Sequence, residues 1–319
     1  MTAVRTLDIA GFRVGRMYHP SHHVLSLDEA EAWYERVLGR ESLPMALMNQ
    51  GRPPTPGYPQ DYSTFTPIAD LLLDTIDPKR YVTGGIQRYP TVETPHLKGF
   101  GWYVPDMQAC YTAINDLGIG TVGQNDDPGG GPEVPRSANG TLPLFFTTPE
   151  TAGLRYEFLP TIPFPLDPRI KEGWELPPAS GDPVLGIDHT SHHTVLTGDL
   201  DRALKVVVTA LGGRVIHEGR NELLGLTSTY VQLSDSILEY GTPDEGTDAW
   251  ADWQTTRPHD TYHTITFRVA DLGKVAAHLD AQGVAFRTRT DEAIVADPRT
   301  ALGIPWIFTT APVPGDPRG

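Results

Sequence analysis

A repeated segment constrains the fold of this 319-residue chain more than any other feature. Four stretches begin with Ser or Asp, continue for about three helical turns and end in Gly; they span residues 26–39, 106–118, 199–212 and 271–283. The separations from start to glycine are 13, 12, 13 and 12 residues. Ser and Asp side chains accept hydrogen bonds from the free N–H groups at a helix start, and Gly readily adopts the left-handed conformation that ends a helix. The pattern predicts four helices.

Strands of period two precede these helices. Ile265, Phe267 and Val269 alternate with other residues before the helix at 271, and the stretch before residue 106 has the same pattern. Further β-rich stretches follow each helix, as in TYVQLSDSILEYGTP. One unit is therefore a strand, a helix and about three strands. The chain is predicted to be an α+β protein of four βαβββ modules.

A proline-rich stretch divides the modules into two pairs. Seven prolines lie between Pro160 and Pro183, a density typical of a linker. We therefore predict an N-terminal pair of modules at 1–160, a linker at 161–186 and a C-terminal pair at 187–319.

The composition excludes several functional classes. The chain has 25 Lys and Arg against 40 Asp and Glu, a net charge of −15, which argues against nucleic-acid or anionic-membrane partners. Its single cysteine, Cys110, excludes an internal disulfide and a Cys-based zinc cluster. No apolar run approaches the ~20 residues that span a bilayer, and the first residues do not form a secretory signal. We expect a cytoplasmic protein.

Three segments carry a resemblance to a known family: HHTVLTGDLDRALKVVVTALGGRV (192–215), YHTITFRVADLGKVAAHLDAQGVAF (262–286) and DPRTALGIPWIF (297–308). They resemble the vicinal oxygen chelate superfamily, which contains glyoxalases, bleomycin-resistance proteins and extradiol dioxygenases. The resemblance implies that the four modules form two cupped mixed sheets, the glyoxalase/dioxygenase-like fold. It also implies a metal inside a cup, held by residues on the first and last strands of each module.

The resemblance places metal ligands in the C-terminal half. In the family, the first-strand ligand lies seven residues before the residue that starts the helix. Counting back from Asp199 gives His192, and the last strand of that module supplies Glu239. Counting back from Asp271 gives Thr264, with His263 beside it. A β-bulge would turn His263 inward, so the predicted ligand set is His192, Glu239 and His263.

A second set is predicted in the N-terminal half. Aligning HPSHHVLS with HTSHHTVLT matches His22 to His192, with Asp74 and Glu157 on the last strands of the two modules. The count of seven from Ser26 gives His19 instead, which leaves the register ambiguous. The same count in the second module gives Gly99, which cannot ligate a metal. We therefore expect this half to be a duplicate that serves only as a scaffold, with the metal site in the C-terminal pair of modules; a second, carboxylate-rich site is the alternative.

Two imidazoles and one carboxylate suit Fe(II), and also Mn, Zn or Ni. The resemblance implies a substrate bound through two neighbouring oxygens, so we expect a dioxygenase-like enzyme acting on a small oxygenated, aromatic or polyketide-like molecule, and a homodimer is allowed. Ile307 stands where ring-cleaving relatives carry a last-strand Glu. A metal-dependent lyase or isomerase, and a metal-free binding protein of the bleomycin-resistance type, therefore stay open. His259 and Tyr262 are the candidate catalytic bases.

Overall fold

The computed structural model describes residues 7, 9–49, 57–138, 140–161 and 167–318. It contains the four modules as two eight-stranded mixed sheets, with orders β2-β3-β4-β1-β7-β10-β9-β8 and β12-β13-β14-β11-β15-β18-β17-β16. The first comprises β1 (Met17–His23), β2 (Leu43–Pro44), β3 (Ser63–Ile68), β4 (Leu71–Ile76), β7 (His96–Val104), β8 (Thr121–Val122), β9 (Phe145–Thr147) and β10 (Arg155–Pro160). The second comprises β11 (Ile187–Leu196), β12 (Arg214–Asn221), β13 (Leu226–Leu233), β14 (Ser236–Pro243), β15 (Thr261–Val269), β16 (Phe286–Arg289), β17 (Ala293–Ala296) and β18 (Ile307–Thr309).

The four predicted helices are confirmed, together with their caps. They are α1 (Leu27–Trp33), α2 (Met107–Asp116), α4 (Leu200–Leu204) and α6 (Leu272–Ala281), and each starting Ser or Asp accepts a backbone N–H bond with its side chain. π-Helical turns, Tyr34–Leu38 and Lys205–Ala210, complete the first and third helices. These are the two segments with 13 rather than 12 residues before glycine, because a π turn accommodates one extra residue.

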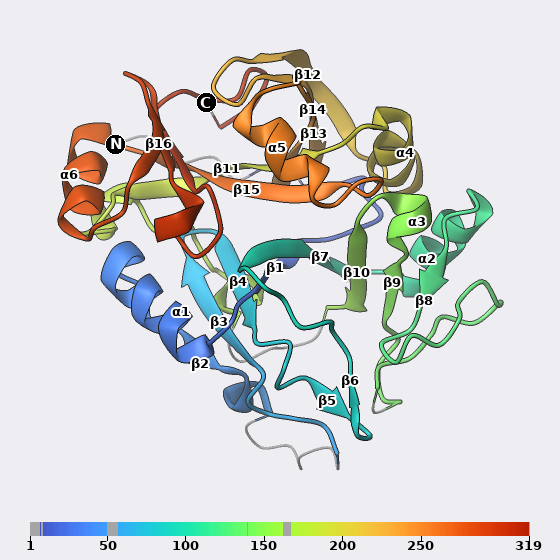
Figure 1. Ribbon diagram of the computed structural model, residues 1–319. Helices are drawn as coiled ribbons and strands as arrows, with labels where there is room; N and C mark the ends of the chain where they lie inside the picture. Colours follow the sequence, from blue (N-terminus) through green and yellow to red (C-terminus); the bar gives the residue numbers. More distant parts are fainter. Residues whose placement is uncertain (1–6, 8, 50–56, 139, 162–166, 319) are drawn as a thin grey trace.

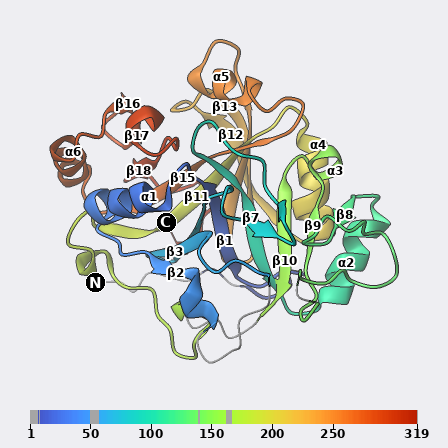
Figure 2. The ribbon, with the colours of Figure 1, turned by 60° about the horizontal axis from the view of Figure 1, so that its bottom comes forward.

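The two sheets share one hydrophobic core. Buried residues of both halves, including Trp102, Tyr156, Tyr240 and Phe267, form a single cluster. Figures 1 and 2 show α1 beside α6 on one side of the molecule, with α2, α3 (Pro149–Ala152) and α4 together on the other. Helices of different halves are thus packed in pairs, and Arg36 in the turn after α1 donates to the Gln282 carbonyl after α6 at 2.7 Å.

The modules carry a few additions. A hairpin of β5 (Val82–Thr83) and β6 (Ile86–Gln87) precedes β7, and α5 (Asp248–Gln254) connects β14 to β15. The described part of the predicted linker, residues 161 and 167–186, contributes no strand to either sheet but contains two short 3-10 turns, Pro168–Ile170 and Ala179–Gly181; residues 162–166 lie outside the described chain. In the part of the chain that the structure describes, no helix has the length and apolar character needed to cross a bilayer.

Candidate functional site

The N-terminal cup brings together one imidazole and two carboxylates. Nε2 of His19, on β1, lies 3.4 Å from a carboxylate oxygen of Glu157 on β10 and 3.9 Å from one of Asp74 on β4. The side chains of His19 and Asp74 are buried, and that of Glu157 is 19% exposed. Asp74 and Glu157 were predicted to lie in one site. The structure brings them together, with His19 between them.

Strand register explains this convergence. Ser21 on β1 pairs with Asp74 on the parallel strand β4. His19 pairs across β1 and β7 with Gly101, which in turn pairs with Glu157. A side chain at Gly101 would meet the imidazole, since a Cβ there would lie 3.0 Å from Nε2 of His19. The glycine therefore leaves room for the histidine between the two carboxylates.

Burial and charge shift the pKa values of this group. Burial alone would lower the pKa of His19, but its hydrogen bond to Glu157 and the charges of Asp74 and Glu157 outweigh burial and raise it. Burial raises the pKa of Asp74 to about 6, and the nearby charge of Glu157 adds to this effect. Ser63 also donates a short hydrogen bond to Asp74. The cup thus concentrates negative charge in a buried place.

Tyrosines lie around these acids. The hydroxyls of Tyr58 and Tyr62 are 2.9 Å apart, and Gln124 donates to the hydroxyls of Tyr58 at 3.1 Å and Tyr81 at 2.9 Å. Burial raises the pKa of all three phenols, and the charge of Glu157 or Asp74 adds to each rise. The cup therefore presents neutral phenol hydroxyls and aromatic faces close to its charged centre.

The prediction that His22 belongs to this set is wrong. Its Nδ1 accepts a hydrogen bond from the Tyr34 hydroxyl at 2.5 Å, and its Nε2 donates to the carbonyl of Leu302 at 2.9 Å. His22 lies three residues from His19, and an odd separation along a strand turns a side chain to the opposite face. Burial lowers its pKa to about 3, so it is neutral. The imidazole ties the first sheet to the second half.

The C-terminal cup holds the equivalent pair, His192 and Glu239, at 3.5 Å. The Glu239 carboxylate is already saturated: it accepts hydrogen bonds of 2.6–2.8 Å from four side chains, those of Thr194, Asn221, Ser228 and Tyr230. Burial would raise the pKa of Glu239, but the hydrogen bond and charge of His192, aided by these donors, lower it to about 2. A carboxylate with this many donors has few lone pairs left for a metal ion.

The remaining ligand positions of this cup are also unsuited to a metal. Thr264 donates its hydroxyl to the carbonyl of Pro305 at 2.6 Å. Ile307 pairs with Thr266, just as Glu157 pairs with Gly101 in the first sheet, so the apolar residue occupies the place of the acid. Donor chemistry therefore favours the N-terminal cup over the C-terminal cup.

The predicted convergence of His263 on Glu239 is wrong. A register shift in the pairing of β15 with β11 leaves His263 as the bulged residue, as expected. Its Nε2 nevertheless lies 3.0 Å from Asp252 on α5, and Arg287 binds the same carboxylate at 2.8 Å. As the side chains stand, the described residues include no group of three or more His, Cys, Asp or Glu that could hold a metal ion.

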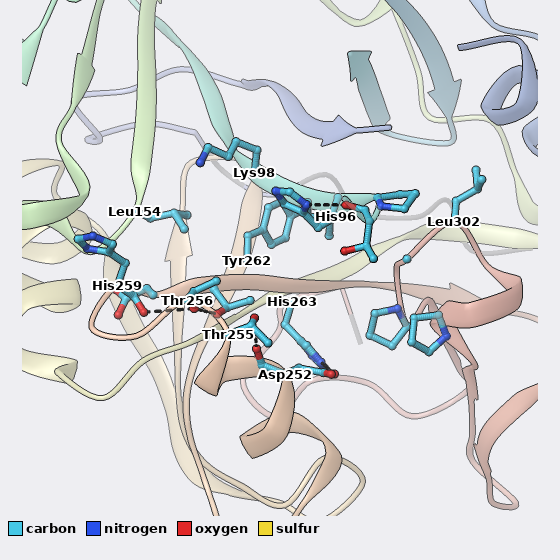
Figure 3. Close-up of a pocket in the computed structure, with 18 of the residues that line it drawn as sticks. His96, Lys98, Leu154, Asp252, Thr255, Thr256, His259, Tyr262, His263 and Leu302 are labelled. Carbon is cyan, nitrogen blue, oxygen red and sulfur yellow. Dashed lines mark hydrogen bonds and ion pairs between the residues drawn. The ribbon is translucent and has the colours of Figure 1, made fainter. Parts of the chain in front are cut away.

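The two candidate bases lie in neither cup. His259 and Tyr262 line a cavity of about 1070 Å³ between the two halves, together with His263 (Figure 3). The Tyr262 hydroxyl hydrogen-bonds to Nδ1 of His193 at 2.6 Å, and burial raises the pKa of this phenol well above its usual value. A neutral phenol held in this way does not act as a base at neutral pH.

Sequence reasoning missed a pair of arginines beneath the cups. Arg169 donates to the carbonyl of Tyr18, the residue before His19, at 2.6 Å. Arg318 donates to the carbonyl of Ser191, the residue before His192, at 3.0 Å. Each arginine also pairs with the Asp two residues before it. The motif Asp-Pro-Arg follows the last strand of each sheet, at 167–169 and 316–318, and this repetition is the signal that would have identified them.

Comparisons with known proteins agree with this architecture. Residues 187–316 match the family model of a glyoxalase-like domain. Over 94% of each chain, the protein superimposes on a mutant 4-hydroxymandelate synthase from Streptomyces coelicolor, with a TM-score of 0.59 and 13% identity. The chain has the glyoxalase/dioxygenase-like fold. This confirms the predicted resemblance and fold class.

Two further solved structures are similar in fold. A 2,3-dioxygenase from Pseudomonas sp. KL28 matches with a TM-score of 0.58 and 14% identity, over 97% of this chain and 96% of that chain. A Mn(II)-bound glyoxalase from Novosphingobium aromaticivorans matches with a TM-score of 0.56 and 12% identity, over 97% and 86%. No curated protein matches. At these identities the likeness concerns the fold, and the reaction must be argued from the residues.

Proposed function

We propose that this chain is a divalent-metal-dependent lyase or isomerase whose reaction centre is the N-terminal cup. The observation that carries the proposal is the convergence of His19, Asp74 and Glu157 from the first and last strands of two modules. Neighbouring ligands of an ion with bonds of ~2.0–2.2 Å lie roughly 3–4 Å apart, and the separations of 3.4 and 3.9 Å fall in that range.

The donor chemistry supports a cation, although ligation needs the side chains to adjust. His19 at present pairs with both carboxylates, so an ion would replace these pairs; Glu157, the most exposed of the three, has the most freedom to turn. One imidazole and two carboxylates form a harder set than the predicted pair of imidazoles and one carboxylate. The set therefore favours Mn or Zn acting as a Lewis acid over Fe(II) activating oxygen.

The residues of the N-terminal cup would have different roles in such a reaction. A bound divalent ion would lower the pKa of a substrate hydroxyl or of a carbon acid beside a carbonyl. Glu157 is the ligand placed to leave the ion and accept a proton, because Asp74 is held by Ser63 and is less exposed. The phenols of Tyr58, Tyr62 and Tyr81 would donate hydrogen bonds to substrate oxygens. We therefore propose a small oxygenated substrate with an aromatic or polyketide-like body.

The first prediction tests the metal directly. Protein purified without added metal and then equilibrated with Mn(II) should bind about one ion per chain, measured by elemental analysis and by electron paramagnetic resonance titration. His19→Ala should weaken binding by tenfold or more, because it removes a ligand of a three-ligand site. His192→Ala, the matched change in the other cup, should leave Mn(II) binding unchanged.

Two outcomes would overturn this assignment. If His192→Ala loses the ion and His19→Ala keeps it, the metal belongs to the C-terminal cup. If neither the wild type nor the variants bind an ion, and small ligands are returned unchanged, the chain is a metal-free binding protein.

A further inference from the structure

A cavity of about 1070 Å³ lies between the two halves, outside both cups. It is formed by the start of β7, the start of β15, the end of α5 and the loop that follows the 3-10 turn Pro298–Thr300. Cavities of this size bury most of a drug-sized molecule. Figure 3 shows His96 and Lys98 on one wall and Thr256 and His263 facing them from another element.

The charge of this cavity is opposite to that of the chain. The chain has a net charge of −15, yet the side chains that line the cavity include four Lys or Arg against two acids: Lys98, Arg155, Arg287, Arg299, Asp252 and Asp260. Both acids are already paired, Asp252 with Arg287 and Asp260 with Arg202. The carboxylates of the wall are thus neutralised by arginines. Arg155 and Arg299 pair with Asp126 and Asp297, acids outside the wall, and Lys98 remains.

Lys98 is the cation without a carboxylate. Among the residues that the structure describes, no ion pair joins its ammonium group to an acid within 4.0 Å, although the side chain is half-buried. Burial, followed by the positive charge of Arg155, lowers the pKa of Lys98. Arg155 itself has only one acid, the exposed Asp126, at 3.4 Å. A half-buried cation beside a second cation gains from an anion.

Two buried imidazole nitrogens lack a hydrogen-bond partner among the described residues. Nε2 of His23 is buried without a hydrogen-bond partner among the described residues, and its ring centroid lies 5.8 Å from that of His96. Burial lowers the pKa of His23, and the charges of His96, Lys98 and Arg155 lower it further, so this imidazole is neutral and offers a hydrogen-bonding nitrogen, not a charge. Nδ1 of His263, across the cavity, is also buried and unpaired in the described chain.

The rest of the wall is apolar. Leu97, Leu154, Leu302 and Pro305 line the cavity, and Trp33 closes one side of it. An apolar body can rest against these side chains while a charged group reaches the ammonium of Lys98.

We propose that this cavity binds a small organic anion whose carboxylate or phosphate is held by Lys98 and Arg155 and whose apolar body lies against the leucine wall. Arg155 lies two residues before Glu157 on β10, and the charges of both residues act on the phenol of Tyr89, so the site adjoins the N-terminal cup. The proposal does not depend on the reaction proposed there.

The test uses a matched pair of fluorescent probes on the full chain. 8-Anilinonaphthalene-1-sulfonate has an apolar body and one anionic group, and N-phenyl-1-naphthylamine has the same body without the charge. Lys98→Gln should raise the Kd of the sulfonate about tenfold and leave the neutral probe within twofold, because only the charged contact is removed. Lys98→Arg should keep the binding, and Lys171→Gln, at an exposed lysine, should have no effect.

Two further experiments locate the probe and identify the preferred anion. Thr255→Trp, at the exposed rim, should block both probes by filling the cavity. Benzoate or phenyl phosphate should displace the sulfonate where phenol does not, and the stronger competitor shows whether carboxylate or phosphate is preferred. Equal binding by wild type and Lys98→Gln, displacement by phenol, or loss of the sulfonate on His19→Ala would each overturn the proposal, since the last result would place the probe in the cup.

Discussion

Arg169→Ala should lower the free energy of unfolding by about 3–5 kcal/mol. The guanidinium lies beneath the N-terminal cup, where it is 3% exposed, and its partner Asp167 is fully buried. It donates to both oxygens of Asp167 at 2.8 Å and to the carbonyls of Tyr18 at 2.6 Å and Asp70 at 2.8 Å. Alanine would leave a buried carboxylate without its cation and would remove one donor from each of two carbonyls, and urea unfolding at pH 7.5 measures the cost.

The chain provides its own control for this substitution. Asp297-Pro298-Arg299 is the same tripeptide, but the side chain of Arg299 is 86% exposed, and Asp297 is its only ion-pair partner among the described residues. Arg299→Ala should therefore leave the urea midpoint unchanged within error, because exposed pairs contribute little. Asp167→Asn combined with Arg169→Ala should recover part of the loss, since no buried charge then lacks a partner. An equal loss in Arg169→Ala and Arg299→Ala would contradict the structural role of the buried motif.

Local signals predicted the fold well because they act within one module. Helix caps and terminal glycines are properties of a few adjacent residues, and the predicted Ser and Asp caps all make their expected bonds. The difference of one residue between segments even reflects the π turns of the first and third helices. Repetition then implied paired modules, and the two sheets have matching strand orders.

The candidate site was predicted only in part, because two ways of aligning the first strand select histidines on opposite faces of the sheet. Counting seven residues back from Ser26 reaches His19, whereas matching the letters Ser-His-His reaches His22. The count follows backbone geometry from the helix cap into the strand, so it preserves the face of the sheet. The letter match shifts the register by three residues and turns the side chain to the back of the sheet.

Contacts between residues far apart in the chain could not be predicted from the sequence. The bulge at His263 was anticipated, but the approach of Asp252 depends on how α5 packs against β15. The saturation of Glu239 by four donors depends on three successive strand pairings, β12 with β13, β13 with β14 and β14 with β11. The cavity likewise combines segments from both halves of the chain, which no single motif marks.

Acid should destabilise this fold through two buried histidines. His193 and His22 are fully buried, and burial lowers the pKa of each to about 3. The unfolded chain takes up a proton on each near pH 6.5, whereas the folded chain does so only near pH 3. The stability that they contribute is therefore complete above pH 6.5 and is lost as the pH falls. Between pH 7.5 and pH 5 the loss is about 2 kcal/mol for each histidine and about 4 kcal/mol for both.

Urea unfolding of His22→Gln and His193→Gln at pH 7.5 and pH 5 measures this effect. The quantity compared is the change in stability between the two pH values, in each variant and in the wild type. Comparison with the wild type is needed because the raised pKa of Asp74 acts in the opposite direction. Each substitution should reduce the dependence of stability on pH by about 2 kcal/mol over this interval, since glutamine does not titrate. Tyr262→Phe removes the hydroxyl that bonds to His193 at 2.6 Å but keeps the imidazole. It should therefore lower the free energy of unfolding at both pH values and leave the difference between pH 7.5 and pH 5 unchanged. If Tyr262→Phe removes that difference instead, the sensitivity to acid comes from the hydrogen bond and not from burial of the neutral imidazole.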